Sequence, residues 1–180
     1  MAEYIAFLRG INVGGHNVKM DVLCAQFETI GLSKVEAFIA SGNVIFESRS
    51  ADTAKLEATI EKQLALSLGY EVATFVRTRS EVAHLAKYAA FSEEKLAGAG
   101  AFCVAFIKAP LIVVQATTLQ QFATDVDEFH AAGREIFWLC KVRQSESKFS
   151  NAQFERKMGM AATFRSITTV KKLALKYPQR

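Results

Sequence analysis

Two stretches of this sequence decide its fold: TFVRTRSEVAHLAKY, Thr74 to Tyr88, and TFRSITTVKKLALKY, Thr163 to Tyr177. Both begin with Thr-Phe and close with Lys-Tyr at the same separation, and their offset is close to half of the 180-residue chain. Self-similarity over such a distance indicates an internal duplication. The elements around each stretch are therefore expected to recur in the same order.

The first half has the pattern of a β-α-β-β-α-β unit with a helix after it. The apolar run at 4–8 predicts a strand, and apolar residues then recur at helical spacing from Met20 until Gly31, a typical C-terminal cap. The remaining elements are a hairpin of strands 35–39 and 43–48, an apolar helix stripe from Leu56 to Leu68 ended by Gly69, a strand at 71–76, and a helix that Thr78 and Glu81 open as a capping box.

The second half repeats this order. Its predicted elements are strands at 102–109, 127–131, 135–142 and 162–164, helices from Thr117 and Ser150, and a final helix. We therefore predict an α+β fold, a tandem duplication of two ferredoxin-like (β-α-β-β-α-β) units, each followed by an extra helix. The expected boundaries are 1–92 for the first unit, 93–100 for a connection rich in glycine and alanine, and 101–180 for the second unit.

Composition is that of an ordered globular chain. Hydrophobic residues make up 51% of the sequence and charged residues 22%, with only two prolines, which argues against disorder. No apolar run approaches the ~20 residues that span a bilayer, and the first residues lack the basic start and apolar stretch of a signal peptide. We therefore expect a cytoplasmic protein without a membrane partner.

Cysteine and histidine are dispersed along the chain rather than clustered. The three cysteines, Cys24, Cys103 and Cys140, form no C-x-x-C pair, and the three histidines are equally scattered. This spacing supports neither disulfides nor a metal site, so we expect no metal and no cofactor. The apolar periodicity around Cys24 and Cys140 predicts that both thiols are buried and unreactive.

The net charge of +4 is unevenly distributed. Residues 1–90 carry nine Lys and Arg against ten Asp and Glu, whereas residues 91–180 carry thirteen against eight. A basic bias can attract nucleic acid. However, the strands lack the aromatic pattern of RNA-binding sheets, and aromatic residues do not alternate with the basic ones along a groove. A solvated helix surface explains these charges more simply.

The best candidate for a functional site is FLRGINVGGHNVKM, Phe7 to Met20, where the first strand gives way to the first helix. In this topology the end of the first strand and the turn after the second strand lie at one edge of the sheet. Glycines allow close backbone approach, and unpaired N–H groups at a helix start favour an anion. The predicted ligand-binding residues are Arg9, Gly10, Asn12, Gly14, Gly15, Lys19, Ser41, Gly42 and Asn43.

Two interpretations of this loop remain open at the level of sequence. Its spacing is neither the G-x-G-x-x-G of a dinucleotide turn nor the pattern of a P-loop, and a glycine-rich junction is often only a tight connection. In that case Asn12 hydrogen-bonds to backbone within the turn, and Arg9 pairs with a carboxylate. In the other case both side chains face a ligand.

Several motifs carry a resemblance to a known family. FLRGINVGGHNVKM, IASGNVIFES, FVRT before a helix, and the late run SKFSNAQFERKMG followed by ATFRSITTVKKL are similar to a widespread bacterial family of unknown function whose members open with LRGINVGG. The resemblance implies tandem ferredoxin-like units and no established activity. Many relatives have an aromatic residue where this chain has Ile167. The characteristic residues it implies are Arg9, Gly10, Asn12, Gly14, Gly15, Lys19, Met20, Ser41, Gly42, Asn43, Ser150 and Asn151.

The leading functional hypothesis is a binding protein for a small anionic ligand, either a nucleotide or a phosphorylated metabolite. Arg9 would supply a bidentate charge and Lys19 a point charge. The alternatives are nucleic-acid binding through the basic second half, an interaction platform formed by the two sheets, and an enzyme of unknown reaction. For the enzyme, His16 and Ser41 are the candidate base or nucleophile, with Asp21 as a partner.

Overall fold

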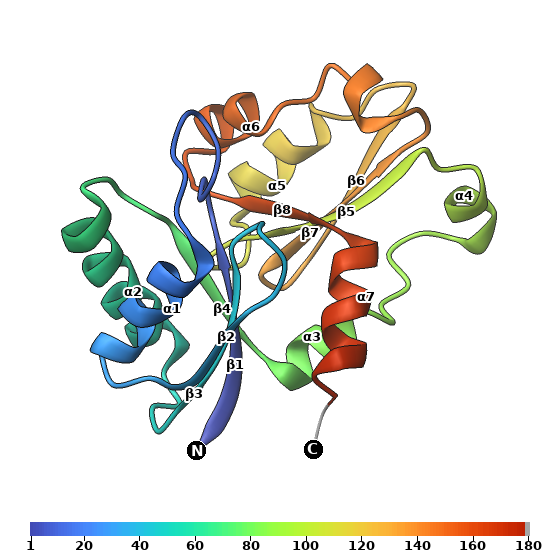
Figure 1. The fold of residues 1–180 in the computed structure, drawn as a ribbon. Coiled ribbons are helices and arrows are strands. Elements are labelled where there is room, and N and C mark those ends of the chain that lie inside the picture. The colour runs from blue at the N-terminus through green and yellow to red at the C-terminus, as the bar shows by residue number, and fades with distance from the viewer. Residues whose placement is uncertain (179–180) are drawn as a thin grey trace. The chain divides into compact units, whose positions relative to one another are not determined.

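The computed structural model describes residues 1–178 and contains two four-stranded antiparallel sheets, each covered by helices (Figure 1). The α+β class and the duplication into two similar halves are confirmed. None of the helices in the described residues is long and apolar enough to cross a membrane. The elements of the first half are β1 (Ala2–Leu8), α1 (Met20–Thr29), β2 (Ser33–Ala37), β3 (Asn43–Ser48), α2 (Thr53–Leu68), β4 (Thr74–Thr78) and α3 (Arg79–Leu85).

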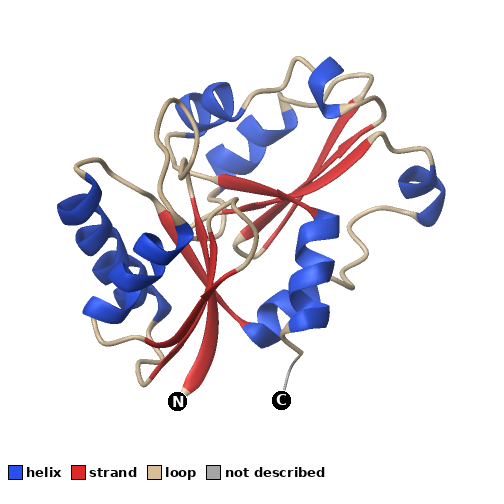
Figure 2. Cartoon of the chain, in the orientation of Figure 1, coloured by secondary structure: helices blue, strands red, loops and turns tan. Residues whose placement is uncertain are grey.

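The second half follows the same order. The elements are α4 (Glu93–Ala97), β5 (Ala101–Phe106), α5 (Val113–Gln120), β6 (Asp127–Ala132), β7 (Glu135–Cys140), a 3-10 turn η1 (Gln144–Glu146), α6 (Asn151–Met158), β8 (Thr163–Ser166) and α7 (Ile167–Lys176). The strand order of the second sheet is β6-β7-β5-β8, which corresponds to β2-β3-β1-β4 in the first sheet. Figure 2 shows the helices and strands of both halves.

The repeated Thr-Phe dipeptides occupy equivalent positions in the two sheets. Thr74 in β4 pairs with Leu8 at the end of β1, and Thr163 in β8 pairs with Phe106 at the end of β5. The predicted correspondence of Phe75 and Phe164 is therefore confirmed, because each is the second residue of the last strand of its sheet.

The chain divides into two compact units, and each unit contains the end of the other half of the chain. Unit 1 comprises Met1–Leu85 together with the chain from Leu173 onward, and unit 2 comprises Ala86–Lys172. Within unit 2 the Tyr88 ring stacks on Phe137, with 4.9 Å between ring centroids. Within unit 1 the Tyr177 ring meets Phe38 edge-on at 6.2 Å. The two tyrosines that close the sequence repeat are thus each packed in the unit built mainly by the other half.

The core of unit 1 lies between its sheet and helices α1 and α2, which cover one face of the sheet (Figure 1). Leu23 and Phe27 of α1 and Leu64 of α2 are fully buried there, as the helical spacing predicts. Gly69 ends α2 in the left-handed conformation with φ 78°, which satisfies a terminal carbonyl through its N–H bond to Ala65.

The core of unit 2 is dominated by aromatic rings around Trp138. The indole N–H donates to the buried Asp127 carboxylate at 2.9 Å, and the Ser147 hydroxyl donates to the same oxygen at 2.9 Å. Thr124 donates to the other carboxylate oxygen, also at 2.9 Å. Because the carboxylate has three donors, this buried charge is a satisfied structural element.

Predicted helix starts agree with the structure where a polar cap marks them. The Thr78 hydroxyl accepts from the Glu81 N–H at 3.1 Å while the Glu81 carboxylate accepts from the Thr78 N–H at 2.7 Å, so the predicted capping box is present. The Ser150 hydroxyl likewise caps α6. The start of α5 was predicted too late, at Thr117, because no Ser, Thr, Asp or Asn stands before Val113. The predicted connection at 93–100 contains the short helix α4.

Edge strand β4 is shielded by two carboxylates of α2. Glu61 accepts from the Thr74 N–H and Glu57 from the Val76 N–H, both at 2.8 Å. The buried Glu57 also lies 3.9 Å from the Arg77 guanidinium, which is fully buried. The two carboxylates bind backbone N–H groups on the outer side of the strand. Without them, these N–H groups would be free to pair with a strand of another chain.

One edge of the first sheet is closed by a tight approach between β1 and the β2–β3 turn. The Leu8 N–H donates to the Gly42 carbonyl at 2.8 Å. Gly42 has φ 73°, and a side chain there would meet Ile11 Cγ2 at 2.9 Å and Leu8 Cβ at 3.2 Å. Only glycine fits this position without displacing its neighbours.

We predict that Glu57→Ala lowers the free energy of unfolding by about 3 kcal/mol, because it leaves a buried N–H without an acceptor and weakens the pairing of a buried guanidinium. Glu57→Gln keeps an acceptor for the Val76 N–H and should lose less. Urea titration followed by circular dichroism measures both variants. Equal losses for the two substitutions would contradict this role of the carboxylate.

We also predict that Gly42→Ala destabilises the protein more than Gly14→Ala. Gly14 has φ 62° but open space around its Cβ position, so alanine there should cost only the left-handed backbone penalty, about 1 kcal/mol. At Gly42 the steric conflict should add about 1 to 3 kcal/mol. The two melting curves are compared directly, and a Gly14→Ala loss as large as that of Gly42→Ala would refute the assignment.

Candidate functional site

The glycine-rich loop, residues 9–19, is held in place by the side chain of Asn12. Asn12 Oδ1 accepts from the Val18 N–H at 2.6 Å, and Asn12 Nδ2 donates to the Ala40 carbonyl at 3.2 Å. The first bond closes the loop on itself, and the second ties it to the β2–β3 turn. The two segments expected at one edge of the sheet are therefore neighbours.

Asn43 stabilises the turn on the other side of this contact. Its side chain is fully buried at the start of β3, where Nδ2 donates to the Phe38 carbonyl at 3.1 Å and to the Ser41 hydroxyl at 2.8 Å. The amides of Asn12 and Asn43 thus bind backbone and a neighbouring hydroxyl. Both residues order the two segments, as the structural interpretation of the loop requires.

Three other predicted residues of the loop lie at the surface. Gly14, Gly15 and Lys19 are exposed, and in the described chain the two glycine N–H groups and the Lys19 ammonium group make no hydrogen bond or ion pair. Gly10 has φ 71° just after Arg9. Arg9 is partly exposed, and its backbone N–H donates to Ala73 at 2.9 Å.

Left-handed backbone is concentrated at this edge. Asn12 has φ 57° and Ile39 has φ 52°, and both lie in the two segments that meet here. A positive φ is uncommon outside glycine and is a genuine outlier for a β-branched residue such as Ile39. The Ile39 side chain is also 52% exposed. Strained backbone persists only where surrounding contacts over-determine it, and such positions cluster at ligand sites.

His16 and Asp21, two of the candidate catalytic residues, have separate partners. His16 stacks on Tyr70, with 3.8 Å between ring centroids, and Asp21 accepts from the Val22 N–H at 2.9 Å. His16 and Asp21 form no hydrogen bond with one another among residues 1–178. The same part of the chain contains no group of three or more His, Cys, Asp or Glu side chains that could hold a metal ion.

The cysteines are free thiols in different environments. Cys140 is buried, as predicted, whereas Cys24 is only partly buried, so the prediction for Cys24 was wrong. Cys24 lies on α1 one residue beyond the buried Leu23, at the margin of the apolar stripe. Burial raises the pKa of the Cys103 thiol to about 11. A protonated, enclosed thiol is a poor nucleophile.

The late motif lies in unit 2 and begins helix α6. Ser150 is its N-cap, and Asn151 Nδ2 donates to the Ala162 carbonyl at 3.2 Å. These bonds fix the start of α6 against the segment that leads into β8. Ser150 and Asn151 thereby have a structural role in the described contacts.

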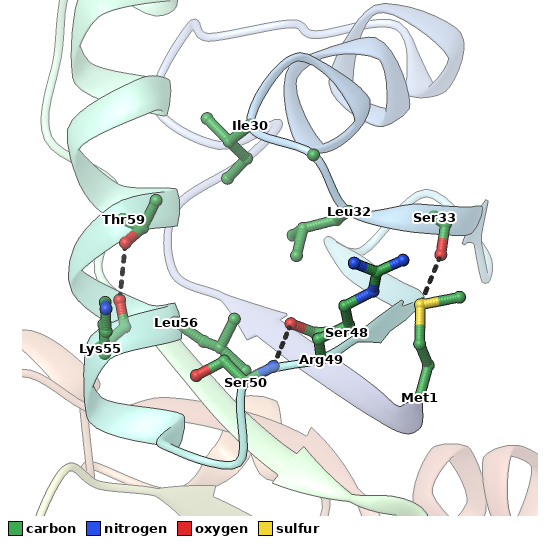
Figure 3. Close-up of a pocket in the computed structure, with 11 residues that line it drawn as sticks. Met1, Ile30, Leu32, Ser33, Ser48, Arg49, Ser50, Lys55, Leu56 and Thr59 are labelled. Carbon is green, nitrogen blue, oxygen red and sulfur yellow. Dashed lines mark hydrogen bonds between the residues drawn. The ribbon is translucent and has the colours of Figure 1, made fainter.

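A cavity at the opposite edge of the first sheet was not predicted. It has a volume of about 510 Å³ and lies among the end of α1, the start of β2, the end of β3 and the start of α2 (Figure 3). Two exposed cationic side chains, Arg49 and Lys55, line it. In the sequence they have the pattern of ordinary solvated charges, so no local signal marks them.

Comparison with known proteins gives a family and a fold. A family model described as "Protein of unknown function (DUF1697)" matches residues 1–137. No curated protein sequence matches the chain. A solved structure, that of the conserved bacterial protein SP0830 from Streptococcus pneumoniae, is 22% identical over 97% of each chain with a TM-score of 0.71.

At that identity the structural likeness shows the fold alone. The family model shows family membership as well, because it matches the whole of the first half and continues to β7. The expected resemblance to an uncharacterised family is confirmed at that level. The protein thus belongs to the family described as protein of unknown function (DUF1697).

Proposed function

We propose that the protein binds a small anionic ligand, a nucleotide or phosphorylated metabolite, at the glycine-rich loop and hairpin turn of unit 1. The observation that carries the proposal is the combination of strained, tightly held backbone at Asn12 and Ile39 with exposed donors beside it. A loop held in a fixed conformation loses little further entropy when it binds a ligand.

The proposed donors are the N–H groups of Gly14 and Gly15 and the Lys19 ammonium group, which have no partner in the described chain. Lys19 directly precedes α1, so an anion beside it also benefits from the partial positive charge at the helix start. Arg9 would add a planar guanidinium at the base of the loop.

The remaining predicted residues act on the loops rather than on the ligand in this proposal. Gly10 supplies left-handed backbone, and Gly42 allows the close approach to β1. Asn12, Ser41 and Asn43 hold the two segments together through the hydrogen bonds described above. This division explains how one motif can be both a tight corner and a binding surface.

Nucleic-acid binding through the second sheet is less well supported. Single-stranded RNA stacks its bases on exposed aromatic rings. In unit 2, however, Phe106 and Phe137 are fully buried and Trp138 is 2% exposed. These three rings are therefore inaccessible to stacked bases, which favours the small-ligand proposal.

We predict that one or more phosphorylated compounds raise the melting temperature of the protein, since a ligand that binds only the native state stabilises it. The test is a thermal-shift series with pyrophosphate, AMP, ADP and glucose 6-phosphate. Lys19→Ala should weaken the binding of a ligand held at the glycine-rich loop about tenfold, because a charge-assisted hydrogen bond is lost. It should leave the melting temperature of the free protein nearly unchanged.

Lys62→Ala is the matched control, because Lys62 is an exposed lysine of α2 with no partner among the described residues. It removes the same charge from unit 1 and should leave binding intact. If no compound binds, or if Lys19→Ala weakens binding no more than Lys62→Ala does, the loop is a structural corner and the proposal fails.

A further inference from the structure

The cavity at the opposite edge of the first sheet is distant from the glycine-rich loop. It is lined by Ser48, which pairs with Ala2 at the start of β1, whereas the loop follows the other end of the same strand, where Phe7 pairs with Asn43. Five residues of extended strand separate these ends by about 16 Å. The cavity therefore lies outside the site of the proposed function and is independent of it.

The rim of the cavity carries two positive charges. Figure 3 shows Arg49 extending from the end of β3 toward Leu32 and Ser33, while Lys55 stands on α2. Neither the Arg49 guanidinium nor the Lys55 ammonium group forms a hydrogen bond or ion pair within the described chain. Both are exposed, so their charges are available to a ligand.

Two serine hydroxyls between these cations have protons left to donate. The Ser48 oxygen accepts from the Ser50 N–H at 3.1 Å, and the Ser50 oxygen accepts from the Asp52 N–H at 3.3 Å. A hydroxyl that accepts such a bond still has its own O–H to donate. In the described chain neither hydroxyl donates elsewhere. Both therefore favour an acceptor-rich group in the cavity.

Acidic groups near this rim are already engaged. The Asp52 carboxylate is the N-cap of α2 and accepts from the Lys55 N–H at 3.0 Å. On the neighbouring strands, Glu47 pairs with Lys34 at 2.8 Å. Neither carboxylate forms an ion pair with Arg49 or Lys55 in the described chain.

The floor of the cavity is apolar. Ile30 and Leu32 contribute from the segment after α1, and Leu56 contributes from the first turn of α2. Leu32 and Leu56 also belong to the core, so this floor is backed by packed side chains. An apolar floor with a few polar groups at the rim, in a volume of this size, is typical of a small-molecule site.

We propose that this cavity is a second binding site, which takes an organic phosphate monoester with a compact apolar body. The phosphate group carries a charge of about −1.5 to −2 at neutral pH, which two cations match. Its oxygens can accept from a guanidinium, an ammonium group and the serine hydroxyls at once. The apolar body of the ester covers Ile30, Leu32 and Leu56.

Phenyl phosphate is the probe, with inorganic phosphate and phenol as its two halves. Isothermal titration of the full chain should show phenyl phosphate binding at least tenfold more tightly than either half. In amide NMR spectra the shifts should centre on Ser48 to Ser50 and Leu56. Shifts centred on Gly14 and Gly15, or binding no tighter than that of inorganic phosphate, would overturn the proposal.

Substitutions then separate the charges from the cavity itself. Arg49→Ala and Lys55→Ala should each weaken binding about tenfold, while Lys62→Ala, one heptad further along α2, should not change it. Thr59→Trp fills the cavity from α2 but keeps both cations, and it should abolish binding. Binding that survives Thr59→Trp would show attraction to surface charge alone and refute a built site.

The Lys19→Ala variant links the two experiments and keeps their failures distinct. It removes a donor from the glycine-rich loop without touching the cavity, so phenyl phosphate should bind it as tightly as it binds the parent protein. Loss of phenyl phosphate binding in Lys19→Ala would place the ligand at the loop and contradict the second site. Failure of every ligand at the loop would leave the result for the cavity unaffected.

Discussion

Strand β1 provides the constraint on which unit 1 depends, because it is paired along both of its sides. Phe7 lies opposite Asn43 in β3 and Phe75 in β4, and similar double pairings run along most of the strand. A strand fixed in this way cannot shift by one residue without turning its core side chains to the other face of the sheet. Its two ends therefore place the glycine-rich loop and the cavity at opposite edges.

The glycine-rich edge shows how one motif serves fold and surface together. Asn12 and Asn43 direct their side chains at backbone groups, which fixes the loop and the hairpin turn relative to each other. The amides of Gly14 and Gly15 are then left at the surface in a defined orientation. In the proposed function, the hydrogen bonds that make the corner rigid would also hold these donors in place before a ligand binds, so binding would cost little further conformational entropy.

The two sequence repeats do not coincide with the two compact units, because the end of each repeat belongs to the unit formed mainly by the other half. Tyr88 and Tyr177 stand at the same place in the repeated sequence, yet Tyr88 packs on Phe137 in unit 2 and Tyr177 on Phe38 in unit 1. Large aromatic rings bury extensive apolar surface. Each compact unit is thus completed by residues that the chain supplies from the other half.

The sequence by itself determined the order of elements, the fold class and most helix ends, because periodicity, capping boxes and left-handed glycines such as Gly31 and Gly69 act within a few residues. It failed at α5, which has no polar cap, and at Cys24, on the margin of a buried stripe. Only the tertiary structure decided that Asn12 binds Ala40 and that Arg49 and Lys55 border one cavity. The reason is physical: such contacts join segments far apart in the chain, and their distances follow from strand pairing and core packing rather than from local sequence.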